Sequence, residues 1–334
     1  MKRLLRFLGF GLLCLLGLLA VVGALFGYFV YSPDPELPQL SGKLSEATIE
    51  VDGFKRTYLT YVPQRLAKGS PLVVVMHGSG QNGAQIRLET GYGFDRLADQ
   101  HGFAVVYPSS HSFDWNDCSQ VGSFVVNGRK VDDLGFLGTM VDQLVADIGI
   151  DRSRVFATGV SAGGFMSIRL ALEAPARFRA VAAVAANVPT PENFKCRPMG
   201  PGTSVMFMNG SQDPLVPFAG GEVNLLGLFF KGGKVRSSRE SAQYFADLNQ
   251  LADPPTTTQS PMIDGGGGRD GVGVGVEQLR WHNASKVEVE LVAIHGGGHG
   301  LPQPHYRRPR LLGPSPMTPD GPAMIWAFFE RQRP

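Results

Sequence analysis

The sequence has few cysteines, no excess of charge of either sign and no cluster that mixes basic with aromatic residues. Its 334 residues include 3 cysteines, and 31 basic residues stand against 29 acidic ones, which gives a formal net charge of +2. A nucleic-acid groove needs a basic surface, usually with aromatic side chains interleaved. These absences argue against nucleic acid as a partner, and nothing in the sequence indicates an obligate protein partner.

The three cysteines have different surroundings. Cys14 lies in the apolar N-terminal run, and Leu13 rather than a small residue precedes it, which argues against lipoprotein acylation. Cys118 and Cys196 remain for the body of the chain. In an oxidising compartment two such cysteines can form a disulfide, and two buried free thiols are the alternative. The residues by themselves leave both readings open.

The N-terminus is unlike the rest of the chain. Lys2, Arg3 and Arg6 precede an almost unbroken apolar run from Phe7 to Tyr31. That length can span a bilayer, and the run offers a poor match to a signal-peptide cleavage site. We expect residues 1–31 to be an uncleaved membrane anchor with its short basic tail in the cytoplasm. The remainder would then face the periplasm or the exterior, or would be secreted if the segment were cleaved.

The body alternates between strand-like and helix-like segments. After a proline-rich tether at 32–45, the stretch "ATIEVDGFKRTYLTYVP" predicts an antiparallel hairpin turning at Asp52-Gly53. Short apolar runs follow, which suit strands buried on both faces: "PLVVVMHG", "FAVVYPS", "RVFATGV", "FRAVAAVAA", "SVMFMNG" and "VEVELVAIHG". Helical spacing in "DDLGFLGTMVDQLVADIG", "SRESAQYFADLNQL" and "DGPAMIWAFFERQ" predicts helices around them. We therefore expect a single α/β domain over 46–334, with a mostly parallel central sheet and helices on both faces.

Two glycine-rich segments interrupt this plan. The region 219–236 contains the apolar stretch "LLGLFF", which could be a lid over an apolar pocket or a loop packed on the core. The region 252–276 has too many Pro, Gly and Thr residues for a helix, and we expect a mobile hairpin or a disordered excursion there.

The stretch "GVSAGG" carries the strongest chemical signal. It follows the apolar strand "RVFATGV" and precedes the helix-like "FMSIRLALEA", which is the strand-turn-helix context of a nucleophile elbow. The flanking glycines let strand and helix approach closely around Ser161. A serine hydroxyl is a poor nucleophile at neutral pH, so the chain must supply a base and a group that orients it.

The base and the acid are expected downstream, in the order Ser, acid, His. Asp213 follows the predicted strand "SVMFMNG", and His299 follows "VEVELVAI" and three glycines. Those glycines allow the loop to approach another backbone closely and to deliver His299 into a crowded site. His295 and His305 are interpreted as a strand-end and a surface residue.

A metal site is the alternative reading of the same histidine-rich stretch. His295 and His299 would share a face only on a helix, and the glycines between them make a helix improbable. Cysteine or carboxylate partners in a fixed geometry are also lacking in the stretch. We therefore expect neither a metal nor a cofactor.

The oxyanion of an acyl-transfer reaction needs two backbone donors. The residue after the nucleophile, Ala162, would supply one, and Ser79 in the loop "HGSGQNG" would supply the other. His77 is expected to brace that loop. With Trp115, it is a candidate for lining the substrate pocket.

Taken in order, these motifs resemble the esterases of the polyhydroxybutyrate depolymerase and LpqC type, relatives of secreted feruloyl and acetyl xylan esterases. The resemblance runs from about Asp52 to Gly300 and rests on "HGSGQ", "VDDLGFL", "GVSAGGFMS", "NGSQDPLVPF" and "GGGHG". It implies an α/β-hydrolase fold and a Ser161–Asp213–His299 triad. It also places "WNDC" and "KCRP" near the site, which favours a Cys118–Cys196 disulfide.

The chain departs from the family's pattern where the substrate would bind. Gly-Leu-Pro follows His299 where family members often have Thr-Trp-Pro, and Ser79 stands where a cysteine is common. The sequence also shows no substrate-binding module.

The sequence predicts a serine carboxylic-ester hydrolase that works through an acyl-enzyme on a feruloyl, acetyl, short-chain or hydroxyalkanoate ester outside the cytoplasm. An acyltransferase with the same three residues is the alternative. An inactive binding protein on a hydrolase scaffold is a third reading. The substrate would be a small or oligomeric ester, and the membrane would be contacted through the N-terminal helix.

Overall fold

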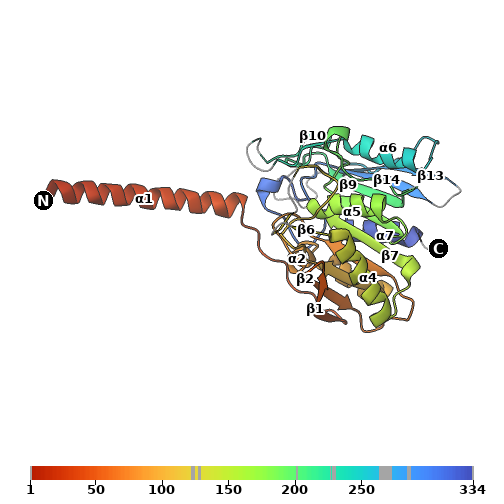
Figure 1. Cartoon of the computed structure of the whole chain (residues 1–334). Helices are drawn as coiled ribbons and strands as arrows, with labels where there is room; N and C mark the ends of the chain where they lie inside the picture. The colour runs from red at the N-terminus through yellow and green to blue at the C-terminus, as the bar shows by residue number, and fades with distance from the viewer. Residues whose placement is uncertain are drawn as a thin grey trace.

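The computed structural model consists of a long N-terminal helix that projects from an α/β body (Figure 1). It describes residues 2–121, 125–126, 129–200, 202–225, 227, 231–262, 273–283 and 287–332. In the helix α1 (Lys2–Phe29), the side chains from Arg6 to Phe29 are exposed. Within the described residues, its segment Arg6–Phe29 is the one helix long and apolar enough to cross a membrane.

A ten-stranded sheet forms the centre of the body as far as the described residues show. In spatial order its strands are β1 (Lys43–Val51), β2 (Phe54–Val62), β4 (Ala104–Pro108), β3 (Leu72–Met76), β7 (Val155–Val160), β8 (Ala180–Val184), β9 (Ser204–Gly210), β14 (Glu288–His295), β13 (Gly275–His282) and β12 (Thr256–Gln259). The six strands from β4 to β14 run parallel, and the pairs at both ends are antiparallel. The predicted mostly parallel sheet is confirmed.

Helices cover both faces of the sheet. The helices are α2 (Gly83–Glu89), α3 (Gly93–His101), α4 (Asp133–Ile148), α5 (Ala162–Glu173), α6 (Ser238–Leu248) and α7 (Gly321–Arg331). Single turns of 3-10 helix lie at η1 (Arg152–Arg154), η2 (Pro191–Asn193) and η3 (Arg310–Leu312). Side chains from α4, α5 and α6 pack in one core, and those from α2, α3 and α7 pack in the other.

The strand side chains explain this two-sided burial. Alternate residues point to opposite faces of a strand, so Val74 of β3 joins the core with α4 while Val73 and Val75 join the core with α7. A strand covered on both faces needs apolar residues at every position. The continuous apolar runs of the sequence therefore became the parallel strands.

The structure adds to the sequence prediction or differs from it in three places. For the region 252–276 the sequence predicts a mobile hairpin or a disordered excursion, and the structure has β12, which pairs antiparallel with β13 and extends the sheet, so the hairpin is the alternative that agrees with the described residues. The strand β13 and the helices α2 and α3 were not predicted, because their apolar residues are few and their flanks are rich in Gly, Asn and Asp. In the region 219–236, β10 (Gly221–Glu222) and β11 (Lys234–Val235) form a small antiparallel pair. Most of "LLGLFF" lies outside the described residues.

A buried ion pair joins the antiparallel edge of the sheet to α4. Arg56 of β2 and Asp133 at the start of α4 are almost fully buried, with 2.5 Å between Arg56 Nη2 and Asp133 Oδ1. Asp133 Oδ2 accepts a hydrogen bond of 2.7 Å from the backbone N–H of Asn116, and the guanidinium lies 4.0 Å from the ring centroid of Phe136. Asp133 thus fixes β2, α4 and the loop around Asn116 together.

Replacing Asp133 by alanine is expected to lower the free energy of unfolding by about 3 to 5 kcal/mol, because Arg56 would remain buried without a counter-charge. Urea unfolding of the full chain measures this loss. The matched control is Asp142→Ala on the exposed side of the same helix, where ion pairs with Arg152 and Arg177 are solvent-accessible. That change should cost at most about 1 kcal/mol. Equal losses for the two variants would contradict the role given to Asp133.

Candidate active site

Ser161 lies on a tight turn between β7 and α5. Its backbone has φ 57° and ψ −119°, a conformation that is costly for any residue except glycine. The neighbouring glycines explain why the turn can form. A Cβ atom on Gly163 would stand 2.3 Å from the carbonyl oxygen of Met76, and one on Gly159 would stand 2.4 Å from the backbone of Gly163. Only glycine fits at these positions, so strand and helix meet closely and leave Ser161 at the apex.

The hydroxyl of Ser161 is not used to stabilise the helix that follows it. A serine at a helix N-cap commonly accepts a hydrogen bond from the first helical turn, but Ser161 makes no such bond. Its backbone N–H donates to the carbonyl of Val184 at 2.9 Å, which fixes the turn against β8. The side chain is thereby left available for chemistry.

Asp213 and His299 are in direct contact. The distance from His299 Nδ1 to Asp213 Oδ2 is 2.8 Å, and both side chains are at most 3% exposed. The other carboxylate oxygen, Oδ1, accepts the backbone N–H groups of Leu215 at 2.8 Å and Val216 at 2.9 Å. These donors hold the carboxylate in place, so it accepts the Nδ1 proton of His299 and leaves Nε2 as the basic nitrogen.

The glycines before His299 allow its loop to pack tightly on a neighbouring segment. The backbone N–H of Gly298 donates to the carbonyl of Pro314 at 2.8 Å, and the backbone N–H of His299 donates to the carbonyl of Leu312 at 2.7 Å. A Cβ atom on Gly298 would lie 2.6 Å from the carbonyl oxygen of Leu312. Close approach of two backbones is therefore what positions His299, as the sequence predicts.

A cavity of about 240 Å³ opens beside Ser161. One wall is apolar and includes Leu215 and Val216, the residues whose N–H groups hold Asp213. Ser79 and Ala162, the two predicted oxyanion donors, also line it. The loop that carries Ser79 lies against the nucleophile, because a Cβ atom on Gly78 would be 3.5 Å from Ser161 Cβ. The cavity thus brings the predicted nucleophile and both predicted donors to one space.

His77 and Trp115, which the sequence suggests as pocket residues, are not among the residues that line this cavity. Both side chains are fully buried, that of His77 at the start of the loop "HGSGQNG" and that of Trp115 against it. His77 Nδ1 donates to the carbonyl of Gly78 at 2.7 Å, its Nε2 accepts from Ser110 N–H at 3.0 Å, and Trp115 Nε1 donates to the carbonyl of His77 at 2.9 Å. The prediction that they line the pocket is wrong, because the sequence does not show which side of a loop a ring occupies. Their contacts brace the loop.

Two carboxyl groups on the polar wall were not identified as site residues from the sequence. Asp114 and Asp117 line the cavity, and burial raises the pKa of both, that of Asp117 to about 6. Asp114 accepts hydrogen bonds from Ser79 Oγ at 3.3 Å and from Trp115 N–H at 2.9 Å. The motif "WNDC" was the available signal, since Asp117 lies within it.

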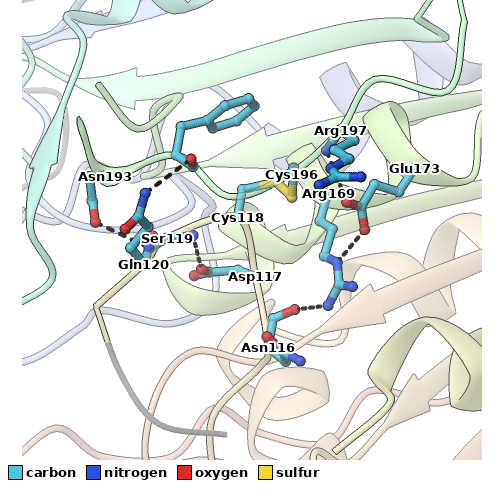
Figure 2. The surroundings of a disulfide bond; sticks show 11 residues. Asn116, Asp117, Cys118, Ser119, Gln120, Arg169, Glu173, Asn193, Cys196 and Arg197 are labelled. Atoms are coloured by element: carbon cyan, nitrogen blue, oxygen red, sulfur yellow. Dashed lines mark hydrogen bonds and ion pairs between the residues drawn. A yellow bond between two sulfur atoms is a disulfide. The ribbon is translucent and has the colours of Figure 1, made fainter. Parts of the chain in front are cut away.

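The polar wall is tied to a distant segment by a disulfide between Cys118 and Cys196 (Figure 2). Backbone contacts support the bridge: Lys195 N–H donates to the carbonyl of Cys118, and Gln120 N–H donates to that of Asn193, both at 2.9 Å. Cys118 lies between Asp117 and Ser119, which both line the cavity. The covalent bond therefore restrains this wall.

The other two histidines of the glycine-rich stretch have different surroundings. His295 Nε2 lies 3.5 Å from Glu277 on the neighbouring strand β13. His305 is exposed, and its backbone N–H donates to Gln303 Oε1 at 2.7 Å. In the described part of the chain, no three His, Cys, Asp or Glu side chains form a group that could hold a metal ion.

Burial lowers the pKa of His77 from 6.5 to about 4, which generates a pH-dependent prediction. Between these values the unfolded chain binds the proton more readily than the folded one, so stability due to His77 is present above pH 6.5 and is lost as the pH falls toward 4. The free-energy difference between the wild type and His77→Gln should therefore shrink by up to about 3 kcal/mol over this range.

Urea unfolding at several pH values measures the difference. The control is His282→Gln, a change at an exposed position. A difference between the wild type and His77→Gln that stays constant from pH 7 to pH 4 would contradict a buried neutral ring at His77.

The disulfide makes a separate prediction about thiols. The unfolded chain should show one reactive thiol without reductant, from Cys14, and three after reduction. The double variant Cys118→Ser, Cys196→Ser should unfold about 2 to 5 kcal/mol more easily. Three thiols titrating without reductant would show that the bridge does not form.

Part of the chain is similar to a known family and to several known proteins. Residues 56–195, which are less than half of the chain, match the family described as "Esterase PHB depolymerase". NocK of Nocardia uniformis subsp. tsuyamanensis, a candidate esterase, is 31% identical over 193 residues, which are 57% of this chain and 54% of that protein. Poly(3-hydroxyalkanoate) depolymerase C of Paucimonas lemoignei is 33% identical over 132 residues, 37% of this chain and 30% of its own length. The chain thus spans about half or less of these relatives.

A solved structure shares the fold over a larger part of the chain. The acetyl xylan esterase from Aspergillus awamori superposes with a TM-score of 0.55 at 21% identity, covering 77% of this chain and 94% of that one. This likeness confirms the predicted α/β-hydrolase fold. The family match confirms the resemblance read from the motifs over residues 56–195, the part of the chain that is similar to the esterase PHB depolymerase family.

Proposed function

We propose that this protein is a serine carboxylic-ester hydrolase. The observation that carries the proposal is the 2.8 Å hydrogen bond between buried His299 and Asp213, on the same sheet edge as the strained turn of Ser161. A buried imidazole held by a carboxylate is the arrangement that converts a serine into a nucleophile. The relatives, one named as an esterase and one as a poly(3-hydroxyalkanoate) depolymerase, support the same activity.

The reaction would begin at the acyl carbon of the ester. Ser161 Oγ attacks this carbon while His299 Nε2 takes the hydroxyl proton, and Asp213 stabilises the imidazolium through Nδ1. The backbone N–H groups of Ala162 and Ser79 stabilise the oxyanion that forms. The C–O bond to the alcohol then breaks, and His299 returns the proton to the leaving oxygen.

Water completes the cycle. His299 removes a proton from a water molecule, whose oxygen attacks the acyl-enzyme, and the second tetrahedral intermediate releases the acid and restores the Ser161 hydroxyl. One ester and one water thus give one acid and one alcohol. Each step uses the chain's own residues.

The cavity suggests the size and character of the ester. Its volume of about 240 Å³ suits a short or single-ring acyl group, such as the acetyl, feruloyl or hydroxyalkanoate groups in the names of the relatives. The apolar wall at Leu215, Val216 and Phe165 would contact the hydrocarbon part. Asp114 and Asp117, which also line the cavity, would accept hydrogen bonds from hydroxyl groups of the substrate.

We also propose that residues 1–31 anchor the protein in a membrane and that 32–45 tether the catalytic domain, 46–334. The span Arg6–Phe29 has the length and the apolar composition for this role. The basic residues at its start favour a cytoplasmic N-terminus. The ester would therefore be met outside the cytoplasm.

Ser161→Ala should lower kcat/KM on short nitrophenyl and feruloyl esters by about 10⁴-fold or more, because it removes the nucleophile. His299→Ala and Asp213→Asn should each lower it by about 10⁴-fold, because the first removes the base and the second removes the carboxylate that orients it. Steady-state hydrolysis by the full chain in detergent measures all three. His305→Ala is the matched control for His299→Ala and should keep its activity, since His305 is an exposed residue of the same stretch.

Unchanged turnover in Ser161→Ala would refute the proposal. Product analysis with glycerol added distinguishes the reaction types, because an acyltransferase would form the glycerol ester whereas a hydrolase yields the free acid.

A further inference from the structure

The end of the anchor helix contacts a segment that also belongs to the active site. We call residues 306–316 the collar. Arg310 of the collar lies over Tyr28 of α1, with 4.2 Å from its guanidinium carbon to the ring centroid, and its Nη1 donates to the carbonyl of Tyr28 at 3.3 Å. The hydroxyl of Ser32 donates to the carbonyl of Arg307. The collar is thus the part of the body that meets the end of the membrane span.

The collar also holds the catalytic loops. The carbonyls of Leu312 and Pro314 accept the N–H groups of His299 and Gly298. Arg308 of the collar forms a partly buried ion pair of 2.9 Å with Glu89, whose carboxylate accepts a 2.5 Å hydrogen bond from Gln81. A short chain of contacts therefore connects the collar with the loop that carries Ser79.

The tether limits how far the body can lie from the bilayer. Ser41 is fixed to the body through its N–H and hydroxyl, which donate to Asp99 at 2.8 and 2.7 Å, and Leu40 packs against the core. The chain between Phe29 and Ser41 can span at most about 40 Å when fully extended. Together with the collar contacts, this short connection orients the body relative to the membrane.

The side of the body that faces the anchor is the catalytic edge of the sheet. In Figure 1, α2, β6 (Arg129–Lys130) and β10, which follow the carboxyl ends of β3, β4 and β9, lie on the side nearest α1, and the C-terminus lies on the opposite side. Exposed apolar side chains occur beside the cavity. Val121 lines the cavity, and its side chain is 41% exposed. The side chain of Phe113 is 61% exposed, and the carbonyl of Phe113 accepts a hydrogen bond from the N–H of Gly80, which follows Ser79.

We propose that the cavity opens toward the bilayer surface and that the substrate is an ester of a membrane-borne molecule. The lipid part stays in the leaflet while the short acyl group, with its ester bond, enters the cavity beside Ser161. This inference rests on the proposed ester hydrolase and its anchor. Withdrawing an alkyl chain into water costs free energy for every methylene, so a catalytic site next to the leaflet avoids a cost that a distant site would meet.

The test compares two acetyl esters of glycerol with the same cleaved bond. Dioleoyl acetylglycerol is embedded in vesicles of phosphatidylcholine and phosphatidylglycerol that carry the full chain, triacetin is added in solution, and acetate release is measured for each. The test variant combines Arg310→Ala, which removes the contacts with Tyr28, with a flexible insertion of about 30 Gly and Ser residues between Tyr31 and Ser32, so that the body can move about 30 Å further away. The control carries Arg310→Ala and the same insertion between Asp253 and Pro254, two exposed residues after α6.

The tether insertion should lower acetate release from the embedded ester at least about tenfold, because the effective concentration of the site at the membrane falls. Triacetin hydrolysis by that variant, and both activities of the control, should be unchanged. Ser161-dependent triacetin hydrolysis together with no loss on the embedded ester would overturn the membrane-borne substrate and leave the hydrolase intact. Hydrolysis of neither ester, with Ser161→Ala equal to the wild type, would overturn the hydrolase itself.

Discussion

Parallel alignment of β7, β8, β9 and β14 is the constraint on which the rest of the structure depends. Because neighbouring parallel strands end at the same edge, the turns that carry Ser161, Asp213 and His299 emerge side by side although 138 positions separate the first from the last in the sequence. Each turn must then avoid its neighbours in a crowded space. Glycine resolves this crowding, since Gly163 packs on the backbone of Met76 and Gly298 packs on that of Leu312.

Much of this arrangement could be predicted from the sequence because it depends on local patterns. Continuous apolar runs gave the six parallel strands, and glycines around Ser161 and before His299 indicated close backbone contacts. Strand β13 was not predicted because several of its positions are only partly buried and carry polar residues. The position of a ring behind a loop is set by tertiary packing, which explains why His77 was assigned to the pocket.

The wall of the cavity that carries Asp117 is polar and is also restrained by a disulfide. The bond joins Cys118 to Cys196 in the segment after β8, and Figure 2 shows Asp117 and Ser119 directly beside Cys118. Asp117 needs this restraint, because its buried carboxyl accepts a 2.6 Å hydrogen bond from Ser119 N–H and a displaced loop would lose it. The carboxylate of the neighbouring Asp114 accepts a hydrogen bond from the hydroxyl of Ser79. A hydroxyl-bearing substrate would therefore meet acceptors that are already oriented.

The hydrogen bonds from Gly298 and His299 to the collar join main-chain atoms. Any residue at position 312 would offer the same carbonyl to the N–H of His299, whereas position 298 has no room for a side chain. Side chains of the collar can therefore diverge during evolution without moving the imidazole. A lineage could adapt this surface to membranes of different lipid content by point substitution, while purifying selection would act on the glycines. Specialisation toward the membrane and conservation of the chemistry are thus separable within one short loop.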